Sequence, residues 1–168
     1  MPDAWIRLLG DPVLRQLARP LDRLDDVTRA QLSRMAVLLE EADGAGLAAT
    51  QVGYLRRAFV YRTSPDGRVR ALVNPAIVAR SEERAEFVEG CLSFRDVLVT
   101  VERPAAVRVE ATGVDGRDVV INAEGFEASL LQHEIDHLDG VLTIDRATPA
   151  ERRRVRMAMI ASPGLRAA

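Results

Sequence analysis

The sequence predicts an α+β fold: a single compact domain in which antiparallel β-sheets pack around a central helix, with a further helix at the C-terminus. The chain has 168 residues and is 48% hydrophobic, which suits one domain with its own core over residues 1–168. Short apolar runs separated by turn residues fill its middle part. Helical patterns precede and follow this strand-rich region.

The first expected element is a helix that starts near Asp25-Asp26. Acidic residues are favoured at a helix N-terminus, and Gly44 is a natural stop. The glycine-rich segment that begins at Gly44 therefore follows a helix directly, where backbone amides can be presented without side chains in the way. The apolar stripe of this helix consists of Leu32, Met35, Leu39 and Ala42.

Alternating apolar residues and hairpin turns predict the strands. The turn at Ser64–Gly67 joins one pair, and Asp115-Gly116 joins another. The expected strands are 58–61, 69–73, 97–101, 107–111 and 119–121.

The two helices that follow differ in character. The segment 126–138 is strongly apolar and carries both histidines of the chain, His133 and His137, within an HExxH pattern. Four residues apart on a helix, the two imidazoles project from one face and can share one metal ion, with Glu134 beside them. Farther on, Thr148 to Glu151 has the form of a capping box with proline at the first helical position, which opens a C-terminal helix to about residue 160.

The third metal ligand has to come from another residue type. Thr143 stands where one large group of metalloproteases has a third histidine, and Glu151 is better explained as a helix cap. Cys91, the single cysteine, is the remaining strong candidate, since a lone cysteine cannot form a disulfide within the monomer. A set of one cysteine and two histidines leaves a fourth position open for water, as a catalytic site requires.

At this point the sequence resembles the peptide deformylase family of bacterial type. Three motifs carry the resemblance, in the order in which the family has them, and it extends over most of the chain up to the end of the histidine helix. The motifs are 44–53 (GAGLAATQVG), 89–93 (EGCLS) and 132–140 (QHEIDHLDG), with support from 11–15 and 73–75.

The resemblance implies a hydrolase of protein biosynthesis that removes the formyl group from N-terminal formyl-methionine of nascent peptides and releases formate. It also implies one divalent metal ion held by Cys91, His133 and His137. This ion would be Fe(II) in the cell, with zinc, nickel or cobalt possible in purified protein. Glu134 would take a proton from the attacking water and pass it to the departing amine.

The resemblance assigns further roles around the reacting carbonyl. The side-chain amide of Gln51 and the backbone N–H of Leu92 would donate to the oxyanion. Gly44 and Gly46 would keep their loop open for close approach of the substrate. Asp136 is expected to support the site structurally rather than to catalyse.

An apolar pocket for the methionine side chain is expected beside the metal. Phe126 and Leu130 precede His133 by seven and three positions, so they share its helix face. The others occupy neighbouring positions by resemblance. The expected pocket residues are Ala45, Phe87, Phe126, Ser129 and Leu130.

The chain also departs from the family pattern. Phe94-Arg95-Asp96 lacks the usual proline, Leu98 stands where many members have arginine, and Ala45 replaces a larger residue. Two alternatives follow: a related metal-dependent amidase with altered N-acyl peptide preference, or a non-catalytic metal-binding module at the ribosome. Retention of Glu134 argues against the second, because a binding module does not need it.

Composition restricts the partners and the location. The net charge of −2 gives no sign of specific nucleic-acid binding, and no apolar run is long enough to cross a membrane. The N-terminus shows no targeting signal, so a cytoplasmic location is expected. The run Arg152–Arg154 is interpreted as a solvated helix face. Transient ribosome contact through this helix is the alternative that the resemblance raises.

Overall fold

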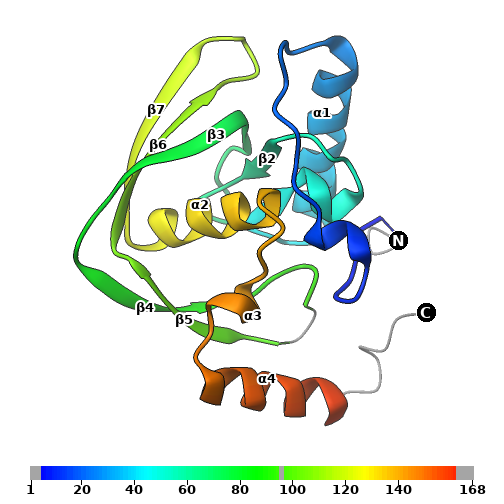
Figure 1. Ribbon diagram of the computed structural model, residues 1–168. Helices are drawn as coiled ribbons and strands as arrows, with labels where there is room; N and C mark the ends of the chain where they lie inside the picture. The colour runs from blue at the N-terminus through cyan, green and yellow to red at the C-terminus, as the bar shows by residue number, and fades with distance from the viewer. Residues whose placement is uncertain (1–4, 95–96, 162–168) are drawn as a thin grey trace.

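Two antiparallel sheets enclose the central helix of the molecule (Figure 1). The computed structural model describes residues 5–94 and 97–161. The larger sheet has the order β1-β2-β3-β6-β7, and β4 pairs with β5 in a separate two-stranded sheet. The strands are β1 Gly46–Ala48, β2 Ala58–Tyr61, β3 Arg70–Arg80, β4 Arg84–Glu89, β5 Val99–Pro104, β6 Ala106–Thr112 and β7 Asp118–Glu124. The helices are η2 Pro12–Arg15, α1 Asp26–Glu41, η3 Ala49–Val52, α2 Gly125–Leu138, α3 Thr143–Arg146 and α4 Pro149–Ala161.

Strand β2 shows how the larger sheet is covered on both faces. All four of its residues are buried. Because neighbouring side chains in a strand point to opposite faces, Phe59 and Tyr61 pack with the apolar residues of α2. Ala58 and Val60 pack on the other face, with those of α1. The sheet therefore lies between the two long helices, and most of the core lies along its two faces.

Helix α2 is buried along nearly its whole length. Every residue from Ala128 to Leu138 is buried, including both histidines and Glu134. A helix that is covered all round is a core helix, so polar groups on it must find partners inside the protein. The histidine motif is thus held in the most enclosed part of the fold.

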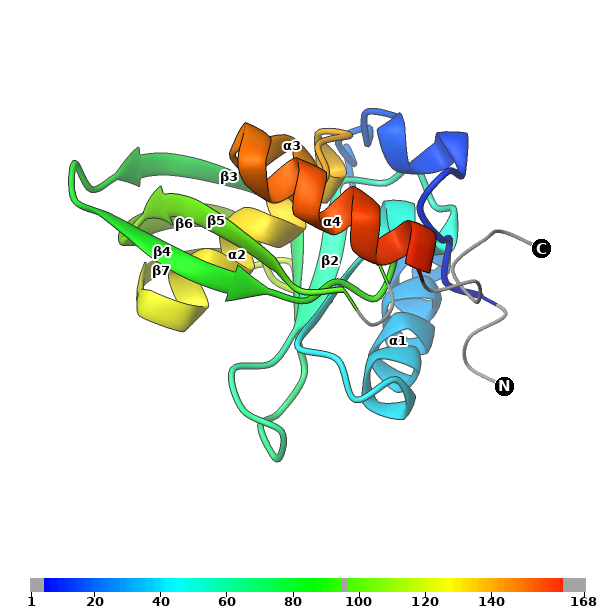
Figure 2. The same cartoon turned by 90° about the horizontal axis from the view of Figure 1, so that it is seen from below.

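The C-terminal helix α4 lies outside the two-stranded sheet, next to β5 (Figure 2). Val155 is fully buried and packs with Val99 and Val101 of β5. The other face of α4 is exposed, including Arg152, Arg153 and Arg154 as expected from the sequence. No helix among residues 5–94 and 97–161 is long and apolar enough to span a membrane.

Most expected elements are confirmed, with several differences. Strand β3 extends seven residues beyond the predicted end at Val73. Strands β1 and β4 were not predicted, and β5 runs over Val99–Pro104 where 97–101 was expected. The capping box is half formed: the Thr148 hydroxyl accepts from the Glu151 N–H at 3.2 Å, but the Glu151 carboxylate accepts from the Thr100 N–H at 2.8 Å and so ties α4 to β5. Arg95 and Asp96, part of the departure from the family pattern, lie outside the described residues.

Candidate metal centre and active-site cleft

The three predicted ligand residues meet at one point of the structure. The Nε2 atom of His137 lies 3.2 Å from Cys91 Sγ and 3.2 Å from His133 Nε2. Tetrahedral coordination with ordinary bond lengths places neighbouring nitrogen and sulfur ligand atoms about 3.3–3.6 Å apart. The cluster is the one group of this kind found in the described part of the chain, and its separations fit a single divalent ion.

The ring orientation of His133 is set from behind by Glu89. His133 Nδ1 lies 2.9 Å from Glu89 Oε2. Burial raises the pKa of Glu89, but hydrogen bonds with His133 and Arg103 outweigh it and bring this pKa down to about 2. The carboxylate can therefore only accept, so Nδ1 carries a proton, and Nε2 is the atom that would hold an ion. The hydroxyl of Thr143 lies 3.2 Å from the same Nδ1 atom.

The pKa values of the two histidines are shifted in opposite directions. Burial lowers the pKa of His133, but its hydrogen bonds with Cys91 and Glu89 raise it more, and the net pKa lies well above the usual value. Burial, reinforced by the charge on His133, holds the pKa of His137 well below the usual value. Proton and metal ion compete for the same lone pairs, so binding of an ion releases a proton from this pair.

Behind His133 lies a buried cluster of charges. Arg103 donates from Nε to Glu89 Oε1 at 2.6 Å and from Nη2 to Glu89 Oε2 at 3.0 Å, and from Nη1 to Asp136 Oδ2 at 2.8 Å. The Ser129 hydroxyl donates to Glu89 Oε1 at 2.6 Å. Arg146 completes the cluster with two bonds to Asp136. Buried charges are tolerated in proteins when they are paired in this way.

Gln51 is held with its amide nitrogen toward Cys91. Its side-chain oxygen accepts from the Ala48 N–H at 2.8 Å, which leaves Nε2 to face the metal ligands. From there Nε2 donates to the Ser93 hydroxyl at 3.0 Å and approaches Cys91 Sγ at 3.6 Å. A buried amide fixed by two partners is a preorganised donor.

Glu134 is buried beside the ligands but is not used by the fold. Its Oε2 atom has no hydrogen-bond partner among the described residues. Burial raises the pKa of this carboxyl group to about 7, against the opposing charge of His133. Its neighbour across the cleft is Gly46, where a Cβ atom would overlap the carboxylate. The resemblance assigned Gly46 to substrate approach, and the structure shows that its missing side chain makes room for Glu134.

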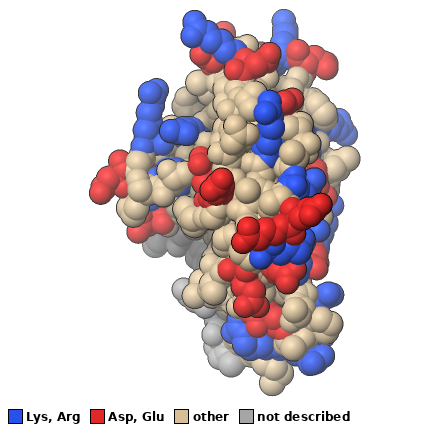
Figure 3. Space-filling model, turned by 90° about the vertical axis from the view of Figure 1, so that its left-hand side faces the viewer, with Lys and Arg blue, Asp and Glu red and all other residues tan. Residues whose placement is uncertain are grey.

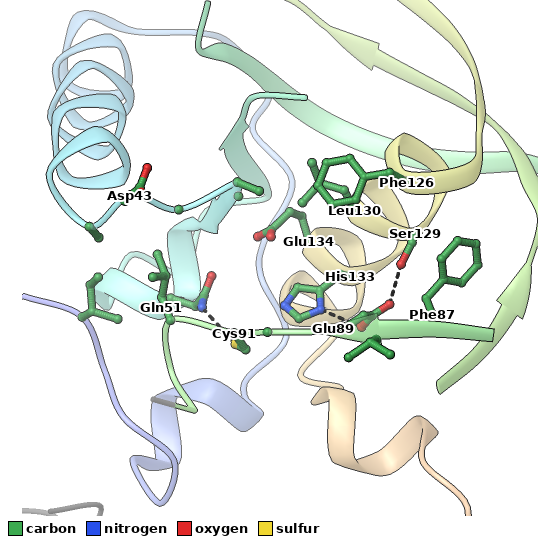
Figure 4. A pocket seen from close by; sticks show the side chains of 18 of the residues that line it. Asp43, Gln51, Phe87, Glu89, Cys91, Phe126, Ser129, Leu130, His133 and Glu134 are labelled. Atoms are coloured by element: carbon green, nitrogen blue, oxygen red, sulfur yellow. Dashed lines mark hydrogen bonds and ion pairs between the residues drawn. The ribbon is translucent and has the colours of Figure 1, made fainter. Parts of the chain in front are cut away.

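A cleft of about 820 Å³ opens from this point to the surface. Figure 4 shows Gln51, Cys91 and Glu134 on its walls, with Glu89 behind His133. Leu92, next to Cys91, also lines it. All five residues expected in the methionine pocket line the same cleft: Ala45, Phe87, Phe126, Ser129 and Leu130.

Sequence reasoning missed part of the site. Arg103 was not considered, and Glu89 was quoted as a motif member without a role. The adjacency of Glu89 to the motif of Cys91 was a signal for its importance, but nothing in the sequence pointed to Arg103. Glu41 and Asp43, at the end of α1, also line the cleft and were not expected there.

This geometry places the protein among metal-dependent hydrolases. Three candidate ligands, one thiol and two imidazoles, would leave a coordination position open, and an unpartnered carboxylate with a pKa near neutrality stands beside them in a cleft. Comparisons with known proteins narrow this class. Residues 3–153 match the model of the polypeptide deformylase family, and the chain belongs to this family.

Relatives cover most of the chain. It is 44% identical over 151 residues to a peptide deformylase of Brucella suis, covering 88% of this chain and 86% of the relative. Identity to a peptide deformylase of Thermotoga neapolitana is 43%, covering 90% and 91%. The crystal structure of peptide deformylase from Thermus thermophilus superposes with a TM-score of 0.85 at 40% identity, covering 94% and 93%. The similarity thus includes all three motifs and the fold around them.

Proposed function

We propose that this protein is a peptide deformylase and that the cluster around Cys91, His133 and His137 is its active site. The family consists of metal-dependent hydrolases that remove the formyl group from nascent peptides. One observation carries the assignment of the site: the three ligand atoms converge in a cleft beside Glu134, a buried carboxylate without a partner in the described structure. A structural metal site would not need that carboxylate.

Glu134 moves the proton in the proposed reaction. When bound, a divalent ion supplies Lewis acidity, which activates water and polarises the formyl carbonyl. Glu134 takes a proton from the attacking water and gives it to the amine nitrogen that leaves. With a pKa of about 7 the side chain is suited to both transfers, because it gains and loses a proton at nearly equal cost near neutral pH. Formate and a free N-terminal amine are the products.

Gln51 and Leu92 stabilise the negative charge that develops on the formyl oxygen. The Nε2 atom of Gln51 already faces Cys91, and the backbone N–H of Leu92 belongs to the residue that follows this ligand. Removing one donor of this kind from an enzyme usually lowers kcat by about 10²–10³. We assign the methionine side chain to the wall formed by Phe87, Phe126 and Leu130.

We propose Fe(II) as the ion used in the cell. Thiolate and imidazole ligands accept iron, cobalt, nickel and zinc, and zinc binds such sites more tightly than Fe(II). Occupancy by Fe(II) therefore depends on which metals are available to the protein. Cys91 is then also the residue most exposed to damage by oxidation.

Formate release from formyl-Met-Ala tests the proposal. Protein purified without oxygen and loaded with Fe(II) is expected to release formate, whereas Glu134→Gln is expected to bind the metal and release almost none. Acetyl-Met-Ala is the comparison substrate, and acetate release equal to formate release would favour the amidase with altered N-acyl preference. Metal bound in both proteins with no product from either substrate would contradict the assignment.

Contact with the ribosome is the second part of the proposal. The outer face of α4 presents Arg153 and Arg156 together with Met157 and Ile160. Elsewhere the charge is mixed: acidic and basic side chains alternate over the face seen in Figure 3. Because nascent chains are the substrate, we place the enzyme in the cytoplasm, where they are made.

Cosedimentation with bacterial ribosomes at rising salt concentration tests this contact. The double variant Arg153→Glu and Arg156→Glu is expected to lose binding, because phosphate contacts by arginine weaken with salt and are lost on charge reversal. Arg84→Glu is the control, because Arg84 pairs with Pro104, at the end of the two-stranded sheet away from the segment Val99–Val101 on which α4 packs. Equal binding by all three proteins would contradict a role of α4.

A further inference from the structure

Arg146 lies outside the cleft and yet reaches the charges behind the metal centre. It belongs to α3, the four-residue helix between α2 and α4, and its side chain is 49% exposed. Its Nε and Nη2 atoms donate to Oδ2 and Oδ1 of Asp136 at 3.1 and 2.6 Å. Two parallel bonds of this kind are the geometry in which a guanidinium holds a carboxylate most firmly.

Asp136 depends on this arginine. Its side chain is 10% exposed while Arg146 covers it. Within residues 5–94 and 97–161, Oδ1 of Asp136 receives a side-chain hydrogen bond from Arg146 alone, while Oδ2 is shared between Arg146 and Arg103. A buried carboxylate that loses a hydrogen-bond donor is stabilised by pairing more closely with the nearest cationic side chain.

That nearest cation is already in use. Arg103 is 4% exposed and directs two of its nitrogens to Glu89, which in turn holds Nδ1 of His133. With Arg146 present, two guanidinium groups balance two carboxylates. Without it, Glu89 and Asp136 would share the single charge of Arg103.

We propose that Arg146 is a positioning residue for the metal centre: by satisfying Asp136, it leaves Arg103 free to hold Glu89 against His133. Loss of Arg146 turns Arg103 toward Asp136 and weakens the two hydrogen bonds from Arg103 to Glu89. The imidazole of His133 can then move relative to the other ligands. The inference rests on the proposed metal site, but not on which amide the enzyme hydrolyses.

The expected effect is moderate, because Arg146 acts on His133 through three intermediates, Asp136, Arg103 and Glu89. Substituting a residue that directly orients a metal ligand typically changes metal affinity or activity 10–100-fold. Arg146 lies three contacts farther from the ligand than Glu89 does, so we expect a smaller effect, about a three- to tenfold faster loss of metal.

The chain offers a matched control in Arg15. Its side chain is also 49% exposed and also forms an ion pair with α3, through Asp145. Asp145 neighbours Arg146, but within the described residues it makes no hydrogen bond or ion pair with Arg103, Glu89 or Asp136. Arg15→Leu therefore loosens the same helix without touching the charges behind His133.

The experiment compares Co(II)-loaded proteins by visible absorption and by the rate at which EDTA removes the ion. Arg146→Leu is expected to shift the Co(II) bands and to release Co(II) three- to tenfold faster, while Arg15→Leu behaves like the unmodified protein. Arg146→Lys keeps the positive charge but cannot form both hydrogen bonds to Asp136, so its spectrum and release rate should lie between those of Arg146→Leu and the unmodified protein. Asp136→Asn combined with Arg146→Leu removes the surplus charge and should return the spectrum toward the original. Circular dichroism confirms that each variant is folded.

Three results would overturn the inference. Arg146→Leu could match the unmodified protein in spectrum and release rate. Arg15→Leu could show the same change as Arg146→Leu, which would mean that both arginines act only by holding α3 in place. The double variant could remain as altered as Arg146→Leu. Formate release is measured separately: an unmodified protein that binds Co(II) with the expected spectra but releases no formate would refute the proposed function and leave the role of Arg146 intact.

Discussion

Replacing Gly46 by alanine should inactivate the enzyme while leaving its metal site and fold in place. A Cβ atom at this position would overlap Oε1 of Glu134 and would stand 2.6 Å from its Cδ and 2.9 Å from its Cγ. These separations are far below van der Waals contact, so the carboxylate must move. The φ angle of Gly46 is not in the left-handed region, so alanine is acceptable to the backbone itself.

The magnitude follows from what Glu134 contributes. Assistance by a positioned general acid or base is typically worth about 10²–10⁴ in rate, and a displaced carboxylate loses most of it. We therefore expect kcat to fall by about 10²–10⁴. Overpacking of a buried site costs about 1–3 kcal/mol, which a small folded domain can tolerate.

The assay is formate release from formyl-Met-Ala, with metal content and thermal unfolding measured on the same preparation. Gly113→Ala is the matched control, because a Cβ there would also be crowded, by Asp115 Oδ1 at 2.9 Å and Val119 Cγ2 at 3.3 Å, but Gly113 does not line the cleft. If Gly46 acts only by making room, the double variant Gly46→Ala with Glu134→Ala should be no slower than Glu134→Ala alone. Full activity in Gly46→Ala, with metal bound, would refute the reasoning.

Three further predictions concern pocket, core and pH. Leu130→Ala should lower kcat/KM for formyl-Met-Ala about tenfold more than for formyl-Ala-Ala, because lost apolar contacts of this size are worth about 1–3 kcal/mol; equal losses would place the methionine elsewhere. Arg103→Met should reduce the free energy of unfolding by about 3–5 kcal/mol in urea titrations, since it removes the buried guanidinium that pairs with both Glu89 and Asp136; a change below about 1 kcal/mol would contradict this. Hydrogen bonds from Arg154 and from the Thr100 N–H lower the pKa of Glu151 from 4.5 to about 2 in the folded state. The ionised Glu151 therefore stabilises the fold fully above pH 4.5, and this contribution is lost as the pH falls toward 2. Glu151→Gln should therefore flatten this acid limb of the thermal stability curve, and an unchanged limb would show that the contact does not matter.

The fold was predictable where side-chain period and turn chemistry agree. Strand β2 was expected over 58–61 and is found there, because its four residues are all apolar and lie between clear turn signals. Strand β4 was missed, because the pattern RAEFVE mixes charged and apolar residues and its one partner in the described sheet, β5, follows ten residues later. Strand β3 runs past Asn74 and Pro75, residues that normally indicate a turn, through an irregularity in its pairing with β6.

The candidate ligands Cys91, His133 and His137, whose role stays a prediction, could be chosen from the sequence for a different reason. Histidine and cysteine are so few in this chain that chemistry alone restricts the choice to Cys91, His133 and His137. Arginine gives no such restriction. The chain has 23 basic residues, all arginine, and nothing local distinguishes Arg103 or Arg146 from the others. Their importance depends on which carboxylates they meet.

By itself the sequence determined the chemistry of this protein: a cysteine, two histidines four residues apart and a glutamate between them, in motifs that are characteristic of the family. Those properties are local, because a helix places its residues on faces by their spacing alone. Only the tertiary structure decided what surrounds them. Glu89, Arg103, Asp136 and Arg146 come from four separate elements and become one charge cluster when two sheets close on α2. Burial there raises the pKa of Glu134 and fixes His133, and burial is a property that no single segment of the chain possesses.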